Sequence, residues 1–331
     1  MILAPLRGVT IRSFREVFAD VIREAGFTEA ITPFIPAMPG FDPLKDRELQ
    51  NAQACPCPRD GDAAGTIKVT PQFIGKDPAA LRSCLEKIKA AGYDTADLNC
   101  GCPFPMVRNK GRGSGILRTP DVLCRMLEVG CEVMGAGKFS IKARLGVDRN
   151  DELLALMPMI NAFPLRYLTV HARTARQMYE GRCDGEMLEK VVRIAKVPVV
   201  CNGDFPFPPP AISDSQSPIS GQSLIPGQSS IFGQSLISGQ SSTFGQSPIR
   251  SLMIGRSFIR YLGTREDIGE LLDRYLVVSQ AELCGDRPVL GRLKELLAYW
   301  KDLPHWKRRW PVLKLARTLD ELRRFNSGGK N

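Results

Sequence analysis

Two cysteines and an asparagine at the end of an apolar run are the residues of this chain best suited to chemistry. Residues 97–103 read Asp-Leu-Asn-Cys-Gly-Cys-Pro, and a glycine-rich basic run, Lys-Gly-Arg-Gly-Ser-Gly, follows at 110–115. Loops at the carboxyl ends of parallel barrel strands carry the active site of such folds. A thiol at that edge can donate a proton, so Cys102 is the candidate catalytic acid.

The alternative for Cys102 is a small core side chain, because most cysteines of intracellular proteins are buried. The neighbouring residues favour the functional interpretation. Pro103 stiffens the turn, Asn99 offers amide donors and acceptors, and the glycines allow a backbone to approach a ligand closely. A core strand gains nothing from this combination.

Short apolar runs alternate with amphipathic stretches along most of the chain, which is typical of parallel βα units. Strands are predicted near 2–4, 30–35, 67–73, 95–99, 139–144, 167–171, 197–202 and 252–255. Helices are predicted over 11–25, 78–91, 120–134, 151–162 and 185–195. The sequence therefore predicts an α/β fold, a (β/α)8 TIM barrel, with a long loop over its mouth at 36–65.

From Thr264 onward the pattern is purely helical, with helices expected over 265–282, 288–301 and 319–324. The middle helix has an apolar stripe and three cations expected to face outward. The stripe is Leu293, Leu296, Leu297 and Trp300, and the cations are Arg292, Lys294 and Lys301. We therefore divide the chain into a barrel domain, residues 1–262, and a C-terminal all-α helical domain, residues 263–331.

Residues 205–250 depart from the barrel pattern. A Pro-rich run at 205–210 precedes a six-residue repeat, approximately Ser-x-Ile-x-Gly-Gln, over 217–246. The repeat stands where the seventh barrel helix is expected. Hexapeptide repeats also build β-helices, but so few units rich in Gly, Ser and Gln favour a flexible, low-complexity insertion.

The 331-residue chain carries a formal net charge of +10. This excess suggests a polyanionic partner, although a solvated basic surface gives the same balance. The chain opens directly on a strand and has no run of membrane-spanning length, so we expect a cytoplasmic protein without membrane contact. Its 10 cysteines are then reduced thiols. The pairs Cys55/Cys57 and Cys100/Cys102 are too closely spaced for a structural zinc site, so no metal is expected.

Several ordered motifs resemble those of the tRNA-dihydrouridine synthases, flavoenzymes that reduce selected uridines of tRNA. Residues 97–103 are similar to the active-site motif, in which the second cysteine is the catalytic acid. A further similar motif precedes it at 3–10, and others follow at 140–146, 169–174, 202–204 and 253–256. The resemblance covers nearly the whole chain outside 205–250. Cys100 and the run at 47–51 lean toward the tRNA-dihydrouridine synthase C branch.

The resemblance implies an FMN cofactor and NADPH as its reductant. The implied cofactor-binding residues are Pro5, Leu6, Arg7, Gln72, Asn99, Lys142, His171, Asn202, Gly203, Asp204, Gly255 and Arg256. Residues 202–204 with 255–256 would hold the phosphate and ribityl chain, and Lys142 would favour the charge of reduced flavin. Leu6 departs from the family, which usually has Met there. Gln72, Lys142 and His171 each also fit a purely structural role.

The implied reaction is reduction of the C5=C6 bond of uridine, with hydride from reduced FMN to C6 and a proton from Cys102 to C5. The base must leave its stack, which requires an extended RNA-binding surface. The implied tRNA-contacting residues are Arg144, Arg173, Arg292, Lys294, Lys307, Arg308 and Arg309. For Arg144 an ion-pair role stays open. For residues 305–310, a solvated basic helix with Trp306 and Trp310 in the domain core stays open.

Two other functions remain. One is a flavin barrel acting on free pyrimidines, as in dihydroorotate or dihydropyrimidine dehydrogenases, against which the basic helical tail argues. The other is an RNA-binding relic whose catalysis was impaired by the repeat. The sequence leaves open the uridine position, the choice of NADPH or NADH, and the oligomeric state, for which a monomer is expected.

Overall fold

The computed structural model describes residues 1–49, 67–208 and 249–321. Within them, ten strands form one sheet in the order β3-β5-β6-β7-β8-β9-β10-β1-β2-β4. In chain order these are β1 (Ile2–Leu3), β2 (Glu29–Ile31), β3 (Ile35–Pro36), β4 (Lys68–Thr70), β5 (Gln72–Ile74), β6 (Ala96–Cys100), β7 (Phe139–Gly146), β8 (Leu168–Thr174), β9 (Val199–Asn202) and β10 (Ile249–Ile254).

The sheet closes into a barrel. β2 and β3 are halves of one extended segment, and β4 and β5 are halves of the next, separated by Pro71. Because β2 pairs with β4 and β3 pairs with β5, the two ends of the strand order belong to the same pair of neighbours. The ten strands thus make eight parallel segments around a closed ring, which confirms the predicted α/β barrel.

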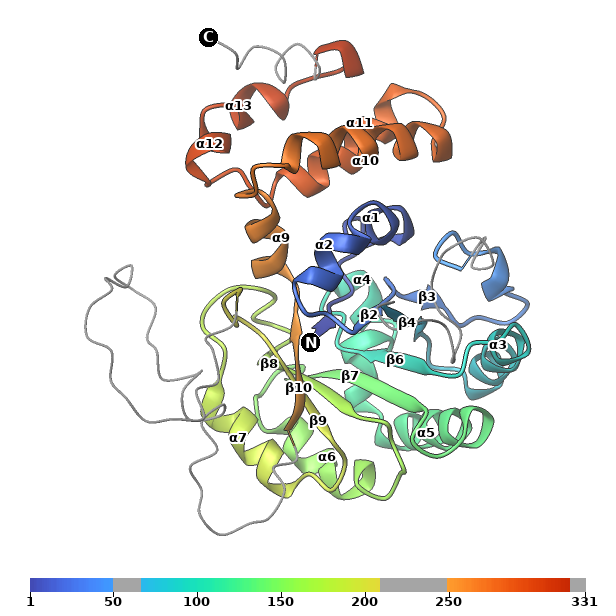
Figure 1. The fold of residues 1–331 in the computed structure, drawn as a ribbon. Helices are drawn as coiled ribbons and strands as arrows, with labels where there is room; N and C mark the ends of the chain where they lie inside the picture. The colour runs from blue at the N-terminus through green and yellow to red at the C-terminus, as the bar shows by residue number, and fades with distance from the viewer. Residues whose placement is uncertain (50–66, 209–248, 322–331) are drawn as a thin grey trace.

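Helices follow the strands and cover the outside of the barrel, as Figure 1 shows. They are α1 (Arg12–Val17), α2 (Ala19–Glu24), η1 (Pro43–Lys45), α3 (Pro78–Ala90), α4 (Pro105–Arg108), η2 (Gly113–Arg118), α5 (Pro120–Met134), α6 (Glu152–Ile160) and α7 (Gly185–Ile194). The helix predicted over 11–25 is divided at Phe18. α3 begins where Asp77 accepts the backbone N–H groups of Ala79 and Ala80.

The barrel contains two kinds of buried interior. A small apolar cluster comprises Ile2, Ala4, Ile31, Tyr167, Val200 and Met253, apart from the larger core between strands and helices. Polar side chains share the buried interior of the barrel, among them Gln72, Asp97, Ser140 and Thr169. Buried polar groups are retained only where they find partners or serve a site, so this interior marks where chemistry is expected.

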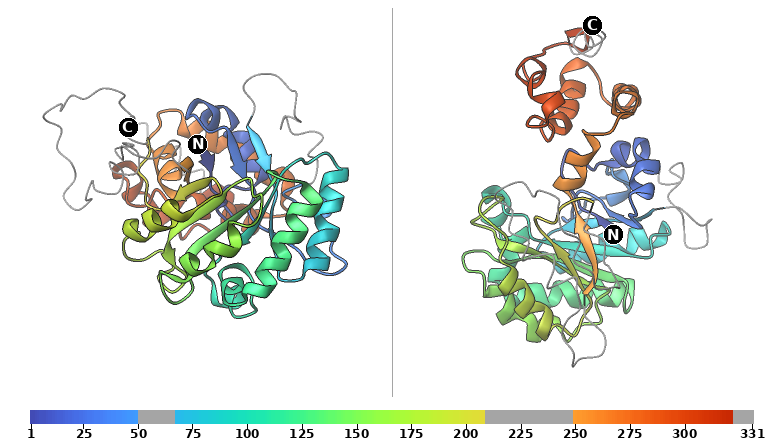
Figure 2. Two further views of the ribbon diagram at one scale, coloured as in Figure 1. Left: turned by 90° about the horizontal axis from the view of Figure 1, so that it is seen from below. Right: turned by 60° about the vertical axis from the view of Figure 1, so that its left-hand side comes forward.

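The C-terminal helices are α9 (Arg256–Leu262), α10 (Ile268–Glu282), α11 (Asp286–Leu297), α12 (Pro304–Lys307) and α13 (Trp310–Leu313). α10 to α13 stand together beyond α9, outside the ring of barrel helices (Figures 1 and 2). Two indoles hold this unit to its first helix, because Trp300 Nε1 donates to the Ile259 carbonyl at 2.6 Å and Trp306 Nε1 to the Gly263 carbonyl at 2.9 Å. Their assignment to a separate domain stays a prediction.

The seam between these helices and the barrel is an ion-pair network over an aromatic contact. Glu282 of α10 accepts from Arg12 of α1 at 2.5 Å and from Arg292 of α11 at 2.6 Å. The Tyr275 ring meets Phe14 and Phe18 edge-on. The helices are therefore seated on α1 by both charge and packing.

Two features of the C-terminal helices differ from the sequence pattern. Arg292 does not face solvent: its side chain is 10% exposed and also donates to Ser13 and Ser279. Lys294 donates to the Ala316 carbonyl at 2.5 Å. Trp306 is buried, as the alternative for 305–310 proposed. Partners distant in sequence decided both orientations.

The Pro-rich and repeat segment falls mostly outside the described residues, so its replacement of the seventh helix stays a prediction. β9 and β10, which flank it, pair directly in parallel. Phe207 packs against Phe27, Phe258 and Tyr261. Among the helices that the structure describes, none has the length and apolar character needed to cross a membrane.

Candidate active site at the mouth of the barrel

The carboxyl ends of the strands bring most of the predicted site residues to one mouth. The parallel register sets Asn99 beside Lys142, Arg144 beside His171, and His171 beside Asn202. The positive charges of Arg144, Arg7 and Lys142 all act on the Cys102 thiol. Residues from opposite sides of the ring therefore share one site.

Cys102 is held in a tight turn. Its backbone N–H donates to Asn99 Oδ1 at 2.8 Å, and its carbonyl accepts from Ser114 Oγ at 2.9 Å. Gly113 has φ +56°, and a Cβ there would lie 2.7 Å from the Cys102 Cβ, so only glycine fits. Burial raises the pKa of the Cys102 thiol, against the lowering effect of a backbone hydrogen bond from Phe104 and the nearby cations. The thiol is therefore protonated at neutral pH.

A chain of buried polar side chains runs from this turn into the barrel. Asn99 Nδ2 donates to Gln72 Oε1 at 2.8 Å, and Gln72 Nε2 donates to Asp97 Oδ2 at 2.7 Å. Ser140 Oγ donates to the other Asp97 oxygen at 2.6 Å. Burial raises the pKa of Asp97 to about 6, while its hydrogen bonds and Lys142 lower it. Sequence analysis missed Asp97 and Ser140; their inward positions two residues before Asn99 and Lys142 were the available signal.

Lys142 and His171 form the polar side of the mouth. Burial and the charge of Arg144 lower the pKa of Lys142 to about 8. Among the described residues its ammonium has no hydrogen-bond partner. Burial, with the charges of Arg144 and other cations, holds the pKa of His171 well below its usual range, so the imidazole is neutral. His171 Nε2 lies 3.3 Å from Arg173 Nη1, so the Lys142 ammonium is the group available to a bound polar ligand.

Arg144 serves the loop that follows β8. Its side chain is buried and donates to the carbonyls of Gly101, Thr174 and Met178. Its guanidinium also lies over the Tyr179 ring, 5.2 Å from the centroid. Tyr179, which sequence analysis missed, is 44% exposed at the mouth; nothing in the spacing of its neighbours pointed to it.

Arg173, Asp204 and Arg256 form a charged group at the ends of β8, β9 and β10. Asp204 accepts from both terminal nitrogens of Arg173 and, at 3.1 Å, from Arg256. The Arg256 guanidinium also lies over Tyr179, at 4.9 Å. Two guanidinium groups against one carboxylate leave a positive excess where the sequence predicts the phosphate site.

The β1 loop adjoins this group. A Cβ at Gly255 would lie 3.0 Å from the Ala4 Cβ and 3.6 Å from a Leu6 methyl, so β1 and β10 approach closely here. Pro5 and Leu6 are half-buried. Asn202 Nδ2 donates to the Met253 carbonyl at 2.8 Å, which ties β9 to β10. Residues predicted from three separate motifs are therefore neighbours.

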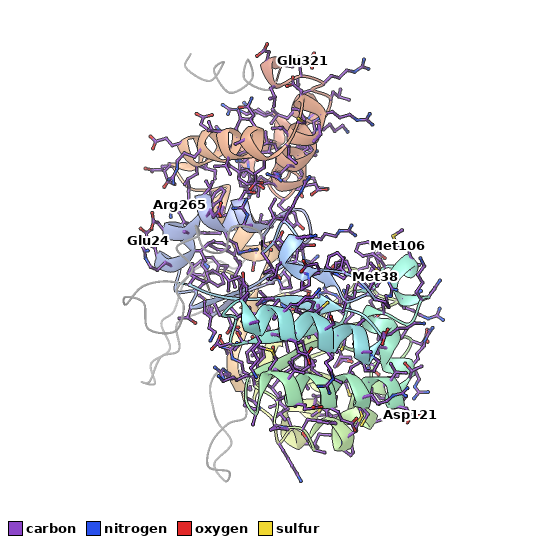
Figure 3. All side chains as sticks on the ribbon, turned by 90° about the vertical axis from the view of Figure 1, so that its right-hand side faces the viewer. Glu24, Met38, Met106, Asp121, Arg265 and Glu321 are labelled. Atoms are coloured by element: carbon purple, nitrogen blue, oxygen red, sulfur yellow. The ribbon has the colours of Figure 1, made fainter. Side chains whose placement is uncertain are left out.

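The rim beside Cys102 is apolar and basic. Phe104 is 45% and Met106 74% exposed. Arg112 contacts the Met38 sulfur, and Figure 3 shows Met38 and Met106 on the same side of the barrel. Of the cations predicted on the C-terminal helices, Lys307 and Arg308 are exposed and Arg309 is half-buried.

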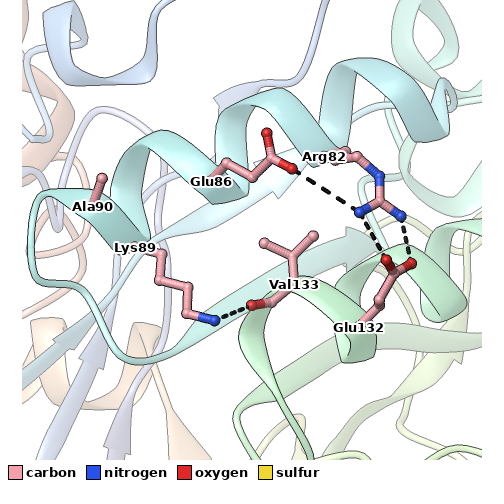
Figure 4. A pocket seen from close by; sticks show the side chains of 6 residues that line it. All are labelled: Arg82, Glu86, Lys89, Ala90, Glu132 and Val133. Atoms are coloured by element: carbon pink, nitrogen blue, oxygen red, sulfur yellow. Dashed lines mark hydrogen bonds and ion pairs between the residues drawn. The ribbon is translucent and has the colours of Figure 1, made fainter.

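A second depression lies on the outer surface between α3 and α5 (Figure 4). Arg82 pairs there with Glu132, and Lys89 donates to the Val133 carbonyl at 2.6 Å. Arg82 and Glu132 neutralise each other and the Lys89 ammonium has a carbonyl partner, so this depression is not the candidate site. Within residues 1–49, 67–208 and 249–321, no three His, Cys, Asp or Glu side chains are grouped to hold a metal; Cys55 and Cys57 lie outside these ranges.

Comparison with known proteins places this architecture among described relatives. The sequence model of the dihydrouridine synthase (Dus) family matches residues 2–210. The chain is 28% identical over 212 residues to tRNA-dihydrouridine(16) synthase of Shigella flexneri, covering 62% of this chain and 64% of that protein. It is 28% identical over 209 residues to tRNA-dihydrouridine synthase B of Vibrio cholerae, covering 63% and 61%. The matches thus span less than two thirds of either relative.

Solved structures also resemble the chain. Morphinone reductase in complex with tetrahydroNAD aligns at a TM-score of 0.47 and 11% identity, covering 78% of this chain and 83% of that one. The old yellow enzyme homologue of Zymomonas mobilis aligns at 0.49 and 13%, covering 78% and 85%. The strand pairing alone establishes the barrel.

Proposed function

Because the chain belongs to the dihydrouridine synthase family, we propose that it reduces the C5=C6 bond of specific uridines in tRNA. FMN is the proposed cofactor and NADPH its reductant. The observation that carries this proposal is the turn at Cys102, whose backbone N–H donates to Asn99 Oδ1 at 2.8 Å, at a mouth where the charges of Arg144, Arg7 and Lys142 act on the thiol. A buried thiol whose backbone is fixed beside cations suits protonation of carbon.

The donor set of the mouth fits a phosphate-bearing polar ring. We assign the ring to Pro5, Leu6, Arg7, Gln72, Asn99, Lys142 and His171, and the phosphate and ribityl chain to Asn202, Gly203, Asp204, Gly255 and Arg256. The unengaged Lys142 ammonium and the half-exposed Arg256 guanidinium support this assignment. When bound, reduced FMN supplies the hydride that adds to C6 of uracil.

Cys102 completes the reduction as general acid. The carbon–hydrogen bond at C6 forms first, and the charge that develops on C4–O and C5 is discharged when the S–H proton passes to C5. The raised pKa keeps that proton in place at neutral pH, and cations next to the thiol stabilise the thiolate left behind. General-acid catalysis of this kind contributes about 10²–10⁴-fold.

Binding of tRNA is assigned to the basic surface outside the mouth. The exposed Lys307 and Arg308, with Arg309, support this role for the helices of residues 263–331. Arg173, Arg292 and Lys294 have partners within the chain, and Arg144 donates to three carbonyls. For these four, the direct tRNA contact stays a proposal that requires their present bonds to rearrange.

Branch membership and location are further proposals. The relatives carry names of both the 16-site and the B synthases, so the C branch rests on Cys100 and the run at 47–51 alone. We propose a cytoplasmic monomer. The direct pairing of β9 with β10 shows that the strands flanking the 205–250 insertion are adjacent in the barrel.

The test is direct. The purified full chain is incubated with FMN, NADPH and unmodified tRNA, and nucleosides are analysed by mass spectrometry. We expect dihydrouridine, seen as a gain of two hydrogen atoms on selected uridines, and no reduction of free uracil. Reduction of free uracil instead would identify a free-pyrimidine reductase, and a flavin-free, inactive protein would identify an RNA-binding relic.

A further inference from the structure

We propose that Asp97 is a positioning residue that sets, through the amides of Gln72 and Asn99, the direction in which the Cys102 turn is held. The consequence for catalysis rests on the proposed function, whereas the hydrogen-bond relay does not. The relay consists of Ser140, Asp97, Gln72 and Asn99.

At the end of the relay next to Cys102, the hydrogen bonds fix one orientation of the Asn99 amide. The backbone N–H groups of Gly101 and Cys102 both donate to Asn99 Oδ1, at 3.1 and 2.8 Å. Backbone N–H groups cannot accept, so the Asn99 oxygen must face them and its NH2 must face Gln72 Oε1. A reversed amide would set donors against donors.

The lower end fixes the same orientation independently. An ionised carboxylate only accepts, so Asp97 requires the NH2 of Gln72 to face it, which turns Gln72 Oε1 toward Asn99. Ser140 supplies the other Asp97 oxygen with a donor at 2.6 Å. The donor-to-acceptor direction is thus the same from both ends of the chain.

Burial makes this direction matter. Gln72, Asp97 and Ser140 have no exposed surface, and Asn99 is 8% exposed. Water therefore cannot supply the hydrogen bonds that a flipped amide would lose. The free-energy cost of leaving a buried polar group unpaired exceeds the net stabilisation from one hydrogen bond. The relay accordingly resists any change that reverses one member.

The experiment exchanges the charge within the relay. In Gln72→Glu, studied at a pH at which both carboxyls are ionised, two carboxylates face each other, and their repulsion should move the new side chain away from Asp97 and Asn99 and break the relay. In the double variant Asp97→Asn with Gln72→Glu, the new amide NH2 donates to the new carboxylate, which still accepts from Asn99, so the direction at Cys102 is restored. Asp97→Leu, which removes the acceptor of Gln72 Nε2 and leaves that amide free to turn, should loosen the Cys102 turn as Gln72→Glu does.

The readout is the rate of Cys102 alkylation by iodoacetamide at fixed pH, measured on the full chain by peptide mass spectrometry. We expect Gln72→Glu to react about tenfold faster than the parent, since one lost hydrogen bond loosens the turn by that factor, and the double variant to return to the parent rate. Thr169→Val is the matched control, because Thr169 is buried in the same barrel and its hydroxyl has no hydrogen-bond partner among the residues that the structure describes. It should match the parent.

Each outcome is decisive. If Gln72→Glu does not fold but the double variant does, the recovery of a folded protein is the result that supports the relay. A Gln72→Glu rate equal to that of the parent, or a double variant that stays as reactive as Gln72→Glu or fails to fold, would overturn the relay. If the alkylation pattern is as expected but the parent forms no dihydrouridine from tRNA, the proposed function fails and the relay stands.

Discussion

Both terminal nitrogens of the Arg173 guanidinium, at the end of β8, donate to the carboxylate of Asp204 in the loop after β9. The same side chain donates to the carbonyls of Glu180 and Gly181, and only 2% of it is exposed. One buried cation therefore holds two loops of the mouth in place.

Replacement of Arg173 should destabilise the fold strongly. Arg173→Gln leaves two carbonyls without a donor and removes the principal partner of Asp204, which is 46% exposed and keeps Arg256, so we expect a cost of about 2–3 kcal/mol. The control is Arg176→Gln, whose side chain is 71% exposed in its pair with Asp148. That change should cost at most about 1 kcal/mol. Urea unfolding measures both, and equal losses would refute the structural role of Arg173.

Lys142 should impose a pH dependence on stability. Its pKa is lowered to about 8 in the fold, against about 10.4 in an unfolded chain. Below pH 8 both states carry the proton, so the cost of burying the charge is fully present. Between these values the unfolded state binds more protons, so stability rises with pH.

The comparison is with Lys142→Met, which never carries the charge. The parent should gain about 1–3 kcal/mol relative to this variant as pH rises from 8 to 10.4. Lys301→Met, at an exposed position, is the control and should show no such trend. A difference between parent and Lys142→Met that is constant with pH would contradict the enclosure of Lys142.

Two helical glycines should respond oppositely to alanine. A Cβ at Gly130 of α5 would lie 2.1 Å from the buried Phe139 ring, whereas a Cβ at Gly291 of α11 would have no described atom within 4 Å apart from its chain neighbours and its own helix backbone. Gly130→Ala should therefore cost about 1–3 kcal/mol through overpacking. Gly291→Ala should stabilise by about 0.5–1 kcal/mol, because glycine is a poor helix former. Shifts of the same sign in urea unfolding would argue against this packing of α5.

Arg256 should contribute to FMN affinity. Removal of its guanidinium in Arg256→Ala takes away a charged donor, and we expect FMN to bind about tenfold or more weakly. Quenching of flavin fluorescence measures the dissociation constant. Arg260→Ala, on the same helix and exposed, is the matched control. Unchanged binding in Arg256→Ala would remove this residue from the proposed phosphate site.

The barrel was predictable because each strand is a short apolar run that ends in polar residues. The periodicity of apolar residues located the strands. Because the carboxyl ends of parallel strands lie at the same end of a barrel, it also predicted which residues line the mouth. It did not separate the roles of side chains whose partners lie far away in sequence. Arg292 points inward because its guanidinium donates hydrogen bonds to Glu282 and Ser13, neither of which lies on its own helix.

The site shows the same division. Asn99 and Cys102 stood out by type and spacing, whereas the bonds that orient them come from Gln72 and Asp97 on two strands. The short helices α4 and η2, between the strand predicted near 95–99 and the helix predicted over 120–134, pack together at Gly115, where a Cβ would lie 2.1 Å from the Arg108 carbonyl oxygen. Tertiary contacts of this kind leave no periodic signal.

The central claim is that the Cys102 thiol protonates the reduced base. The most direct test is the yield of dihydrouridine from tRNA with FMN and NADPH in Cys102→Ala and Cys100→Ala, the second being a wholly buried cysteine two residues away. We predict that Cys102→Ala loses about 10²-fold or more in rate, with tRNA binding intact, while Cys100→Ala stays near the parent. Equal rates in the parent and Cys102→Ala would contradict the account.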